Sequence, residues 1–218
     1  MFDPYSRDQY DFTKSYTFYI LLANVIVFVI QMLYDPFTEL FALIPDKAFA
    51  GYVWQFVTYM FLHGGFMHIF FNMLVLMIFG FTVEKVLGRQ RFLTVYILSG
   101  IGSAVFYIVI MFMMGGSGSV PLLGASGAIF GLLASYAFLF PKSWVFIWGF
   151  IPLPASVLIV FLLIEETFFG FLGLQPGIAN FGHVGGIITG LLIMFVWRFD
   201  KIRREKRAGM RDYQFIWE

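Results

Sequence analysis

A serine and a histidine stand at the starts of two apolar segments of this chain, and together they could carry out nucleophilic chemistry. Ser126 lies in the stretch GASG at residues 124–127, and His183 lies in GHVGGIITG at residues 182–190. A serine hydroxyl becomes a nucleophile when a neutral imidazole within hydrogen-bond reach takes its proton. These residue types therefore predict acyl-transfer chemistry, provided that the fold brings the two segments together.

Two further polar residues, His68 and Asn72, lie four positions apart in the stretch HGGFMHIFFN at residues 63–72. Residues at this spacing share one face of a helix. Donors at such a place stabilise negative charge that develops on a carbonyl oxygen. The backbone N–H of Ser126 would join them, because the first four N–H groups of a helix have no partner inside the helix. We therefore predict oxyanion stabilisation by His68, Asn72 and Ser126.

Metal binding is the competing use of the histidines. His63 and His68 are five residues apart, a spacing that places two side chains poorly on one helical face, and the sequence contains neither HExxH nor cysteine. We therefore predict no metal site and no cofactor. The net charge of +1 gives no basic surface that would neutralise phosphates, so we expect no nucleic-acid partner.

The composition indicates a lipid bilayer as the solvent, since 60% of the residues are hydrophobic and only 12% are charged. Six segments approach the roughly 20 apolar residues that a spanning helix needs. We predict an all-α polytopic membrane protein with a six-helix domain over residues 16–198, an N-terminal segment over 1–15 and a basic tail over 199–218. The six segments are Tyr16–Tyr34, Met67–Val86, Phe92–Met114, Ser126–Phe140, Pro154–Gly170 and His183–Trp197.

The distribution of basic residues predicts the orientation. Six spans place both termini on one side, and 13 of the 14 Lys and Arg residues fall on that side, with Lys47 the exception. Cytoplasmic connections carry the excess of Lys and Arg. Both termini are therefore expected in the cytoplasm. The short N-terminal segment leads us to expect a prokaryotic plasma or inner membrane.

The fourth segment is too short to cross the whole hydrocarbon layer. Its 15 residues give a helix of about 22 Å, against about 30 Å for the bilayer core. With the inner end at Pro141 and Lys142, Ser126 would lie about 8 Å below the outer surface. Polar groups at that depth are tolerated around a water-filled cavity.

Glycines at a four-residue spacing predict close contact between the fourth and sixth segments. Small residues at this spacing let two helix backbones approach in a membrane. On each segment this glycine face ends at the candidate chemical residue, so the same contact would bring Ser126 to His183. The glycines are Gly127 and Gly131 on the fourth segment and Gly182, Gly186 and Gly190 on the sixth.

In their order and spacing, GASG, HGGFMHIFFN and GHVGGIITG resemble the motifs of the rhomboid family of intramembrane serine proteases. Gly124 and Ser126 match the family's GxSG motif. The resemblance implies a Ser126–His183 dyad without a third acidic member. It implies that His68 and Asn72 stabilise the oxyanion, and that Phe130, one turn below Ser126, lies against the imidazole.

Two features depart from the family pattern. Trp54 is followed by Gln55, where the family often has arginine, which places the anchoring contacts of the first outer connection in doubt. Glu165 and Glu166 are unexpected in the fifth apolar segment. We expect them to face an aqueous cavity or to reach the membrane surface. A role in opening a lateral gate between the second and fifth helices is a further possibility.

The resemblance implies an endopeptidase that cleaves transmembrane protein substrates near the outer face of the lipid bilayer, through an acyl-enzyme. Two alternatives stay open at this point. One is a rhomboid-like protein without catalytic activity that binds or escorts membrane proteins, against which stands the presence of both Ser126 and His183. The other is a small transporter, although the sequence has no inverted repeat. The substrate and the oligomeric state are not predicted.

Overall fold

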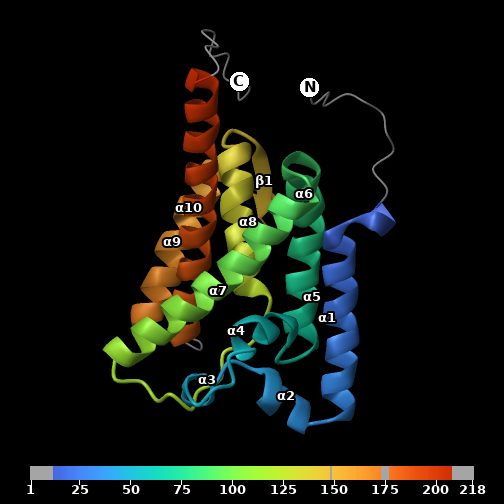
Figure 1. Ribbon diagram of the computed structural model, residues 1–218, viewed down its shortest axis with the longest axis vertical. Helices are drawn as coiled ribbons and strands as arrows, with labels where there is room; N and C mark the ends of the chain where they lie inside the picture. The colour runs from blue at the N-terminus through green and yellow to red at the C-terminus, as the bar shows by residue number, and fades with distance from the viewer. Residues whose placement is uncertain (1–11, 148, 173–176, 208–218) are drawn as a thin grey trace.

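Apolar helices of unequal length make up most of the fold (Figure 1), in a computed structural model that describes residues 12–147, 149–172 and 177–207. Within these residues, five helical stretches are long and apolar enough to cross a membrane, and a sixth, α8, is shorter. The predicted all-α polytopic fold is confirmed. The elements are α1 (Tyr16–Leu33), α5 (Phe66–Val75) continued by the π-helical turn η3 (Leu76–Gly80) and α6 (Phe81–Leu87), α7 (Arg89–Met113), α8 (Ser126–Leu139), α9 (Ala155–Leu172) and α10 (Gly177–Arg207).

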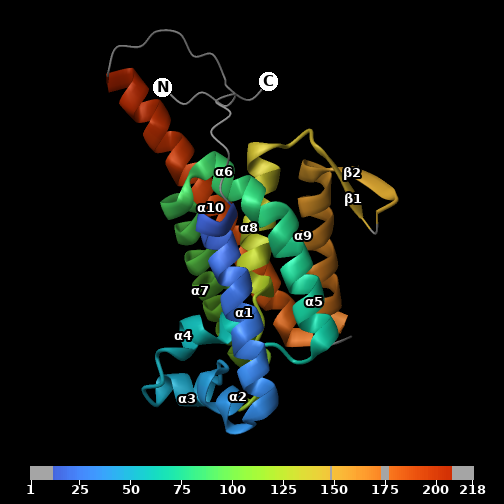
Figure 2. The same ribbon diagram turned by 90° about the vertical axis from the view of Figure 1, so that its right-hand side faces the viewer.

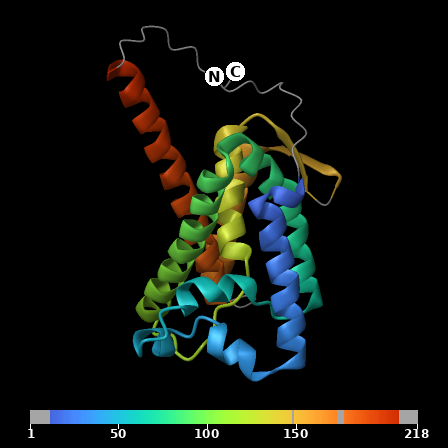
Figure 3. The same ribbon diagram turned by 45° about the vertical axis from the view of Figure 1, so that its right-hand side comes forward.

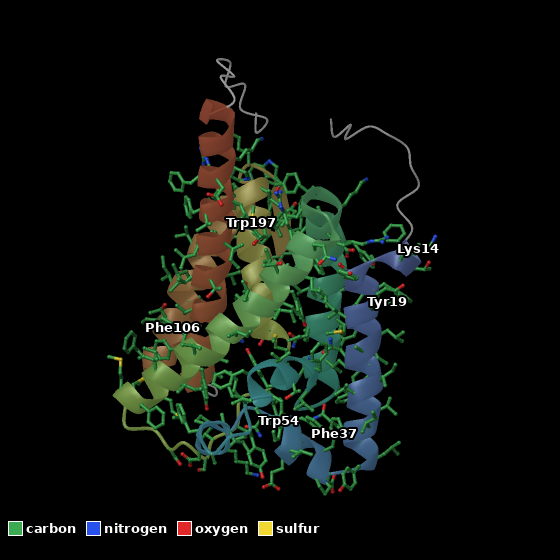
Figure 4. The ribbon with its side chains drawn as sticks, viewed as in Figure 1. Lys14, Tyr19, Phe37, Trp54, Phe106 and Trp197 are labelled. Atoms are coloured by element: carbon green, nitrogen blue, oxygen red, sulfur yellow. The ribbon has the colours of Figure 1, made fainter. Side chains whose placement is uncertain are left out.

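Helix α8 is the inner helix of the bundle. It has 14 residues, which correspond to a length of about 21 Å, whereas the 25 residues of α7 extend over about 37 Å. Most of its side chains are buried, from Gly127 to Leu139. By contrast, α1 exposes large apolar side chains such as Leu22 and Val25, and Figure 4 shows Tyr19 on the outer side of that helix. Exposed apolar surface of this kind suits lipid contact.

The glycines of α8 and α10 meet backbone to backbone. A Cβ added at Gly190 would lie 2.8 Å from the Cα of Gly131, and one added at Gly186 would meet the backbone of Gly127. The predicted close approach of these two segments is therefore present in the structure. Ser99 and Ser103 of α7 occupy the space next to Gly131 and Gly127, so that three helices converge on one line of small residues.

Short helices connect α1 to α5 at one end of the bundle (Figure 2): α2 (Pro36–Phe41), α3 (Pro45–Phe49), α4 (Gln55–Thr58) and the 3₁₀ turn η2 (Tyr59–Phe61). Gln55 is fully buried and anchors this connection. Its Oε1 accepts the N–H of Ile44 at 3.0 Å, and its Nε2 donates to the carbonyl of Leu40 at 3.2 Å. The indole N–H of Trp54 also donates to Leu40, at 3.1 Å. Gln55 therefore anchors the first outer connection, although the family often has arginine at this position.

A β-hairpin joins α8 to α9, which the all-helical prediction did not include. Strands β1 (Trp144–Ile147) and β2 (Ile151–Pro154) pair in antiparallel fashion, with Trp144 opposite Pro154. Gly149 has a φ of +79° between the strands, a conformation that glycine adopts without strain.

The predicted boundaries of the sixth segment are wrong at both ends. Helix α10 begins at Gly177 and continues to Arg207, so His183 lies almost two turns inside the helix, and the predicted tail begins as helix. Figure 3 shows this end of α10 projecting beyond the other helices. The early start has a packing reason. Phe181 is buried, and its ring packs edge to face against Phe171 at 5.2 Å.

Helix α1 begins, and α10 ends, at the same end of the bundle (Figure 1). This arrangement agrees with the predicted even number of crossings. Residues 1–11 of the predicted N-terminal segment and 208–218 of the predicted tail lie outside the described residues, and the 3₁₀ turn η1 (Phe12–Lys14) precedes α1.

Replacing Gly190 by alanine is expected to lower the free energy of unfolding by about 1–3 kcal/mol, because the new methyl group would meet a backbone that cannot move aside. Unfolding of the purified protein in detergent, followed by tryptophan fluorescence, measures this change. Leu192→Ala on the exposed face of the same helix is the control and should unfold nearly as the native protein does. A Gly190→Ala protein of unchanged stability would contradict the proposed contact.

Candidate active site

Ser126 and His183 meet although 57 positions separate them in the chain. The Nε2 atom of His183 lies 2.8 Å from the Oγ atom of Ser126, a hydrogen-bond distance. Ser126 is the first residue of α8, and His183 projects from α10 beside the glycine contact of the two helices. The structure thus brings together the two residues that the sequence singles out as nucleophile and base.

The backbone before Ser126 needs glycine for two reasons. Gly124 has a φ of +124°, which other residues rarely adopt. A Cβ at this position would also lie 2.8 Å from Nε2 of His68 and 3.6 Å from Oγ of Ser126. The N–H of Gly124 donates to the carbonyl of Tyr59 at 3.0 Å, so the connection between α1 and α5 holds the turn that presents the serine.

The imidazole of His68 faces the same turn. Its Nδ1 accepts the backbone N–H of Gly64 at 3.2 Å. In a neutral imidazole the other nitrogen then carries the hydrogen. Nε2 is therefore a donor directed toward the backbone at Gly124, beside Ser126. Asn72 lies one turn further along α5 and donates one amide hydrogen to the carbonyl of His68 at 2.8 Å. Its second amide hydrogen is left for another acceptor.

The ring of His183 is held from two sides. Phe130 of α8 stacks on it, with 4.4 Å between the ring centroids and 13° between the planes. On its other edge, Nδ1 lies 2.9 Å from Oε1 of Glu166 on α9. This contact has the distance of a hydrogen bond, although Nδ1 has no partner at hydrogen-bond angles.

Glu166 was singled out from the sequence as unexpected in an apolar segment, but it was not assigned to His183. The resemblance implied no third acidic member, whereas the structure places this carboxylate beside the imidazole. The carboxylate is buried, and its Oε2 accepts the side-chain N–H of Asn180 at 2.7 Å. The available signal was an ionisable residue in an apolar segment, which marks a candidate functional position by itself. Its partner could not be read from the sequence, since α9 and α10 approach only in the folded chain.

His63 has a supporting place next to the site. Its ring packs edge to face on that of His68 at 5.1 Å, and its backbone N–H donates to Gln31 at 2.9 Å. Burial, followed by the neighbouring His68, lowers the pKa of His63 to about 4. The ring is therefore neutral near pH 7. Over the described ranges, no group of three or more His, Asp or Glu side chains could hold a metal ion.

The fold and site together define an integral, multi-pass helical membrane protein with a serine–histidine pair inside its bundle. Residues 50–198 match the model of the Rhomboid domain. The chain belongs to the rhomboid family.

Curated relatives extend the comparison. The chain is 36% identical to Rhomboid-type serine protease 2 of Emericella nidulans over 176 residues. This matched region covers 78% of this chain and 32% of the relative. It is 33% identical over 159 residues to Putative rhomboid protease YdcA of Bacillus subtilis, covering 71% and 72%. RHOMBOID-like protein 4 of Arabidopsis thaliana is 34% identical over 167 residues, covering 74% and 39%.

The chain spans less than half of the length of the plant and fungal relatives. The relatives come from plants, fungi and bacteria, and one from Arabidopsis thaliana is named mitochondrial. A prokaryotic membrane and cytoplasmic termini therefore stay predictions.

The lowered pKa of His63 predicts a loss of stability in acid. Between about pH 6.5 and pH 4, His63 is protonated in the unfolded chain but stays neutral in the folded chain. His63 therefore contributes up to about 3 kcal/mol of stability above pH 6.5, and this contribution is lost as the pH falls to 4. Thermal unfolding in detergent, measured across this range, should show a flatter pH dependence for His63→Gln than for the native protein. The difference between the two proteins isolates His63 from other titrating groups, and equal slopes would contradict the assignment.

Proposed function

We propose that this protein is an intramembrane serine endopeptidase that cleaves transmembrane protein substrates through an acyl-enzyme. The observation that carries the proposal is the 2.8 Å contact between Oγ of Ser126 and Nε2 of His183. The names of two relatives, a rhomboid-type serine protease and a putative rhomboid protease, add support.

The reaction would proceed in two halves. The oxygen of Ser126 attacks the scissile carbonyl carbon while Nε2 of His183 takes the hydroxyl proton, which gives a tetrahedral intermediate. The carbon–nitrogen bond then breaks, and His183 returns the proton to the leaving amine. In the second half, a water molecule gives a proton to His183 and attacks the acyl-enzyme. The new carboxyl group leaves as Ser126 recovers its hydrogen.

Negative charge on the carbonyl oxygen would be stabilised by donors on two helices. The Nε2–H of His68 faces the turn before Ser126, and the backbone N–H of Ser126 begins α8, where Ala125 offers no side-chain acceptor. Such donors act strongly in a site of low dielectric constant. The free amide hydrogen of Asn72 would complete the group.

The depth of the site determines which bond is cut. With α8 ending at the cytoplasmic surface, its length of about 21 Å leaves Ser126 below the outer surface of a bilayer core of about 30 Å. The distribution of Lys and Arg supports cytoplasmic termini and hence this orientation. Substrates would be cut in the membrane-proximal stretch on the outer side, where water reaches the acyl-enzyme.

Ser126→Ala is expected to abolish cleavage of a single-span substrate in proteoliposomes, as well as covalent labelling by a fluorophosphonate. The matched control is Ser135→Ala on the same helix, because that buried hydroxyl donates to the carbonyl of Gly131 at 2.9 Å and lies away from His183. Ser135→Ala should cleave and label nearly as the native protein does. Cleavage by Ser126→Ala at the native rate would overturn the protease assignment, and a native protein that binds the substrate without labelling would favour a non-cleaving role.

His68→Ala is expected to reduce kcat by roughly 10- to 1,000-fold with little change in KM, because an oxyanion donor acts mainly in the transition state. Steady-state cleavage kinetics in detergent measure both constants. Asn72→Ala, tested in parallel, should show the same pattern. A rise in KM at constant kcat would instead make these residues substrate contacts.

A further inference from the structure

Both oxygens of a buried carboxylate on α9 contact residues of α10. Glu166 is 7% exposed and lies three turns into an apolar helix, where an unpaired charge is costly. Its Oε2 accepts the amide N–H of Asn180 at 2.7 Å, and its Oε1 lies 2.9 Å from Nδ1 of His183. Asn180 and His183 are three residues apart and therefore share one face of α10.

We propose that Glu166 is the positioning residue of the catalytic histidine, so that the site works as a Ser126–His183–Glu166 triad. The proposal rests on the proposed protease function. For His183 to accept the serine proton at Nε2, its own hydrogen must sit on Nδ1. A carboxylate at Nδ1 favours that tautomer, and it stabilises the imidazolium that forms once Nε2 takes the proton.

The off-line angle at Nδ1 is compatible with this role. The stacked ring of Phe130 restricts the plane of the imidazole, so the alignment has to come from the carboxylate. The terminal torsion of a glutamate is broad, which lets Oε1 shift toward the ring plane. Asn180 limits the shift, because it holds the second oxygen.

The neighbouring Glu165 provides a matched comparison. Glu165 and His68 also lie within electrostatic reach of His183. Glu165 has the same carboxyl group on the same helix, but it is one residue and hence about 100° around the helix from Glu166, and it is more exposed. An effect of negative charge alone would appear for both residues, whereas an effect of position would appear for Glu166 only.

Cleavage kinetics of the full chain in proteoliposomes test the proposal with four variants. Glu166→Gln keeps the shape but loses the charge, and we expect kcat to fall by roughly 100- to 10,000-fold with KM nearly constant. Glu166→Asp keeps the carboxylate and should recover part of the rate. Glu165→Gln should stay close to the native protein. Asn180→Ala should show an intermediate loss, because the carboxylate loses its second tether.

A spectroscopic measurement separates positioning from mere support of the fold. The chain has three histidines, so ¹⁵N-histidine labelling gives three imidazoles to assign in a proton spectrum. A hydrogen shared between Nδ1 and a carboxylate is strongly deshielded. We expect such a resonance for His183 in the native protein, in Glu165→Gln and in the inactive Ser126→Ala, and its loss in Glu166→Gln.

The two hypotheses fail in different ways. Native kcat in Glu166→Gln, or a native protein without the deshielded His183 resonance, would overturn the triad while leaving Ser126 as the nucleophile. Undiminished cleavage by Ser126→Ala would overturn the protease function itself, whatever the resonance shows. If Glu166→Gln fails to fold, the resonance in the native protein and the cleavage rate of Glu166→Asp still test the triad. A Glu166→Asp protein that cleaves no faster than Ser126→Ala would count against it.

Discussion

The backbone contact between α8 and α10 is the constraint on which the site depends. Gly131 and Gly190 approach so closely that a single added carbon at Gly190 would lie 2.8 Å from the opposite Cα. Lipid offers no hydrophobic drive between helices, so close van der Waals contact of small residues has to hold them together. Because the two helices are held at this distance, Oγ of Ser126 and Nε2 of His183 lie 2.8 Å apart.

Among the described residues, the two buried carboxylates, Glu84 and Glu166, both lie against polar groups with both of their oxygens. Glu84 is 1% exposed and accepts the backbone N–H groups of Tyr16 and Thr17, both at 2.8 Å, together with the hydroxyl of Thr17. It thereby serves the first turn of α1, whose N–H groups lack partners within the helix. Glu166 differs because one of its neighbours is a titratable imidazole. Glu84 is thus stabilised by groups that hold α1 in place, whereas Glu166 lies beside the proposed catalytic histidine.

The connection between α1 and α5 has a structural task at the site. Leu43 and Leu122 exchange two backbone hydrogen bonds, of 3.0 and 2.8 Å, and Tyr59 accepts the N–H of Gly124. The connection therefore holds the chain just before α8, and Gln55 fixes the connection in turn through Ile44 and Leu40. Gly124 itself adopts a φ of +124° readily because it is glycine, and its hydrogen bond to Tyr59 fixes the position of this turn relative to the connection.

The sequence alone determined the class of fold, the approximate spans and the residues that meet at the centre, because apolar runs, glycine spacing and isolated polar residues are local signals. Ser126, His183 and the glycine faces were predicted on this basis, and the structure brings them together. Tertiary structure decided the start of α10, the β-hairpin and the partner of His183. The sequence marked Glu166 as an ionisable residue in an apolar segment. Its contact with His183 could not be predicted, because it depends on which side of α9 packs against α10. Contacts between helices depend on rotation and depth, and no local pattern of residues specifies these.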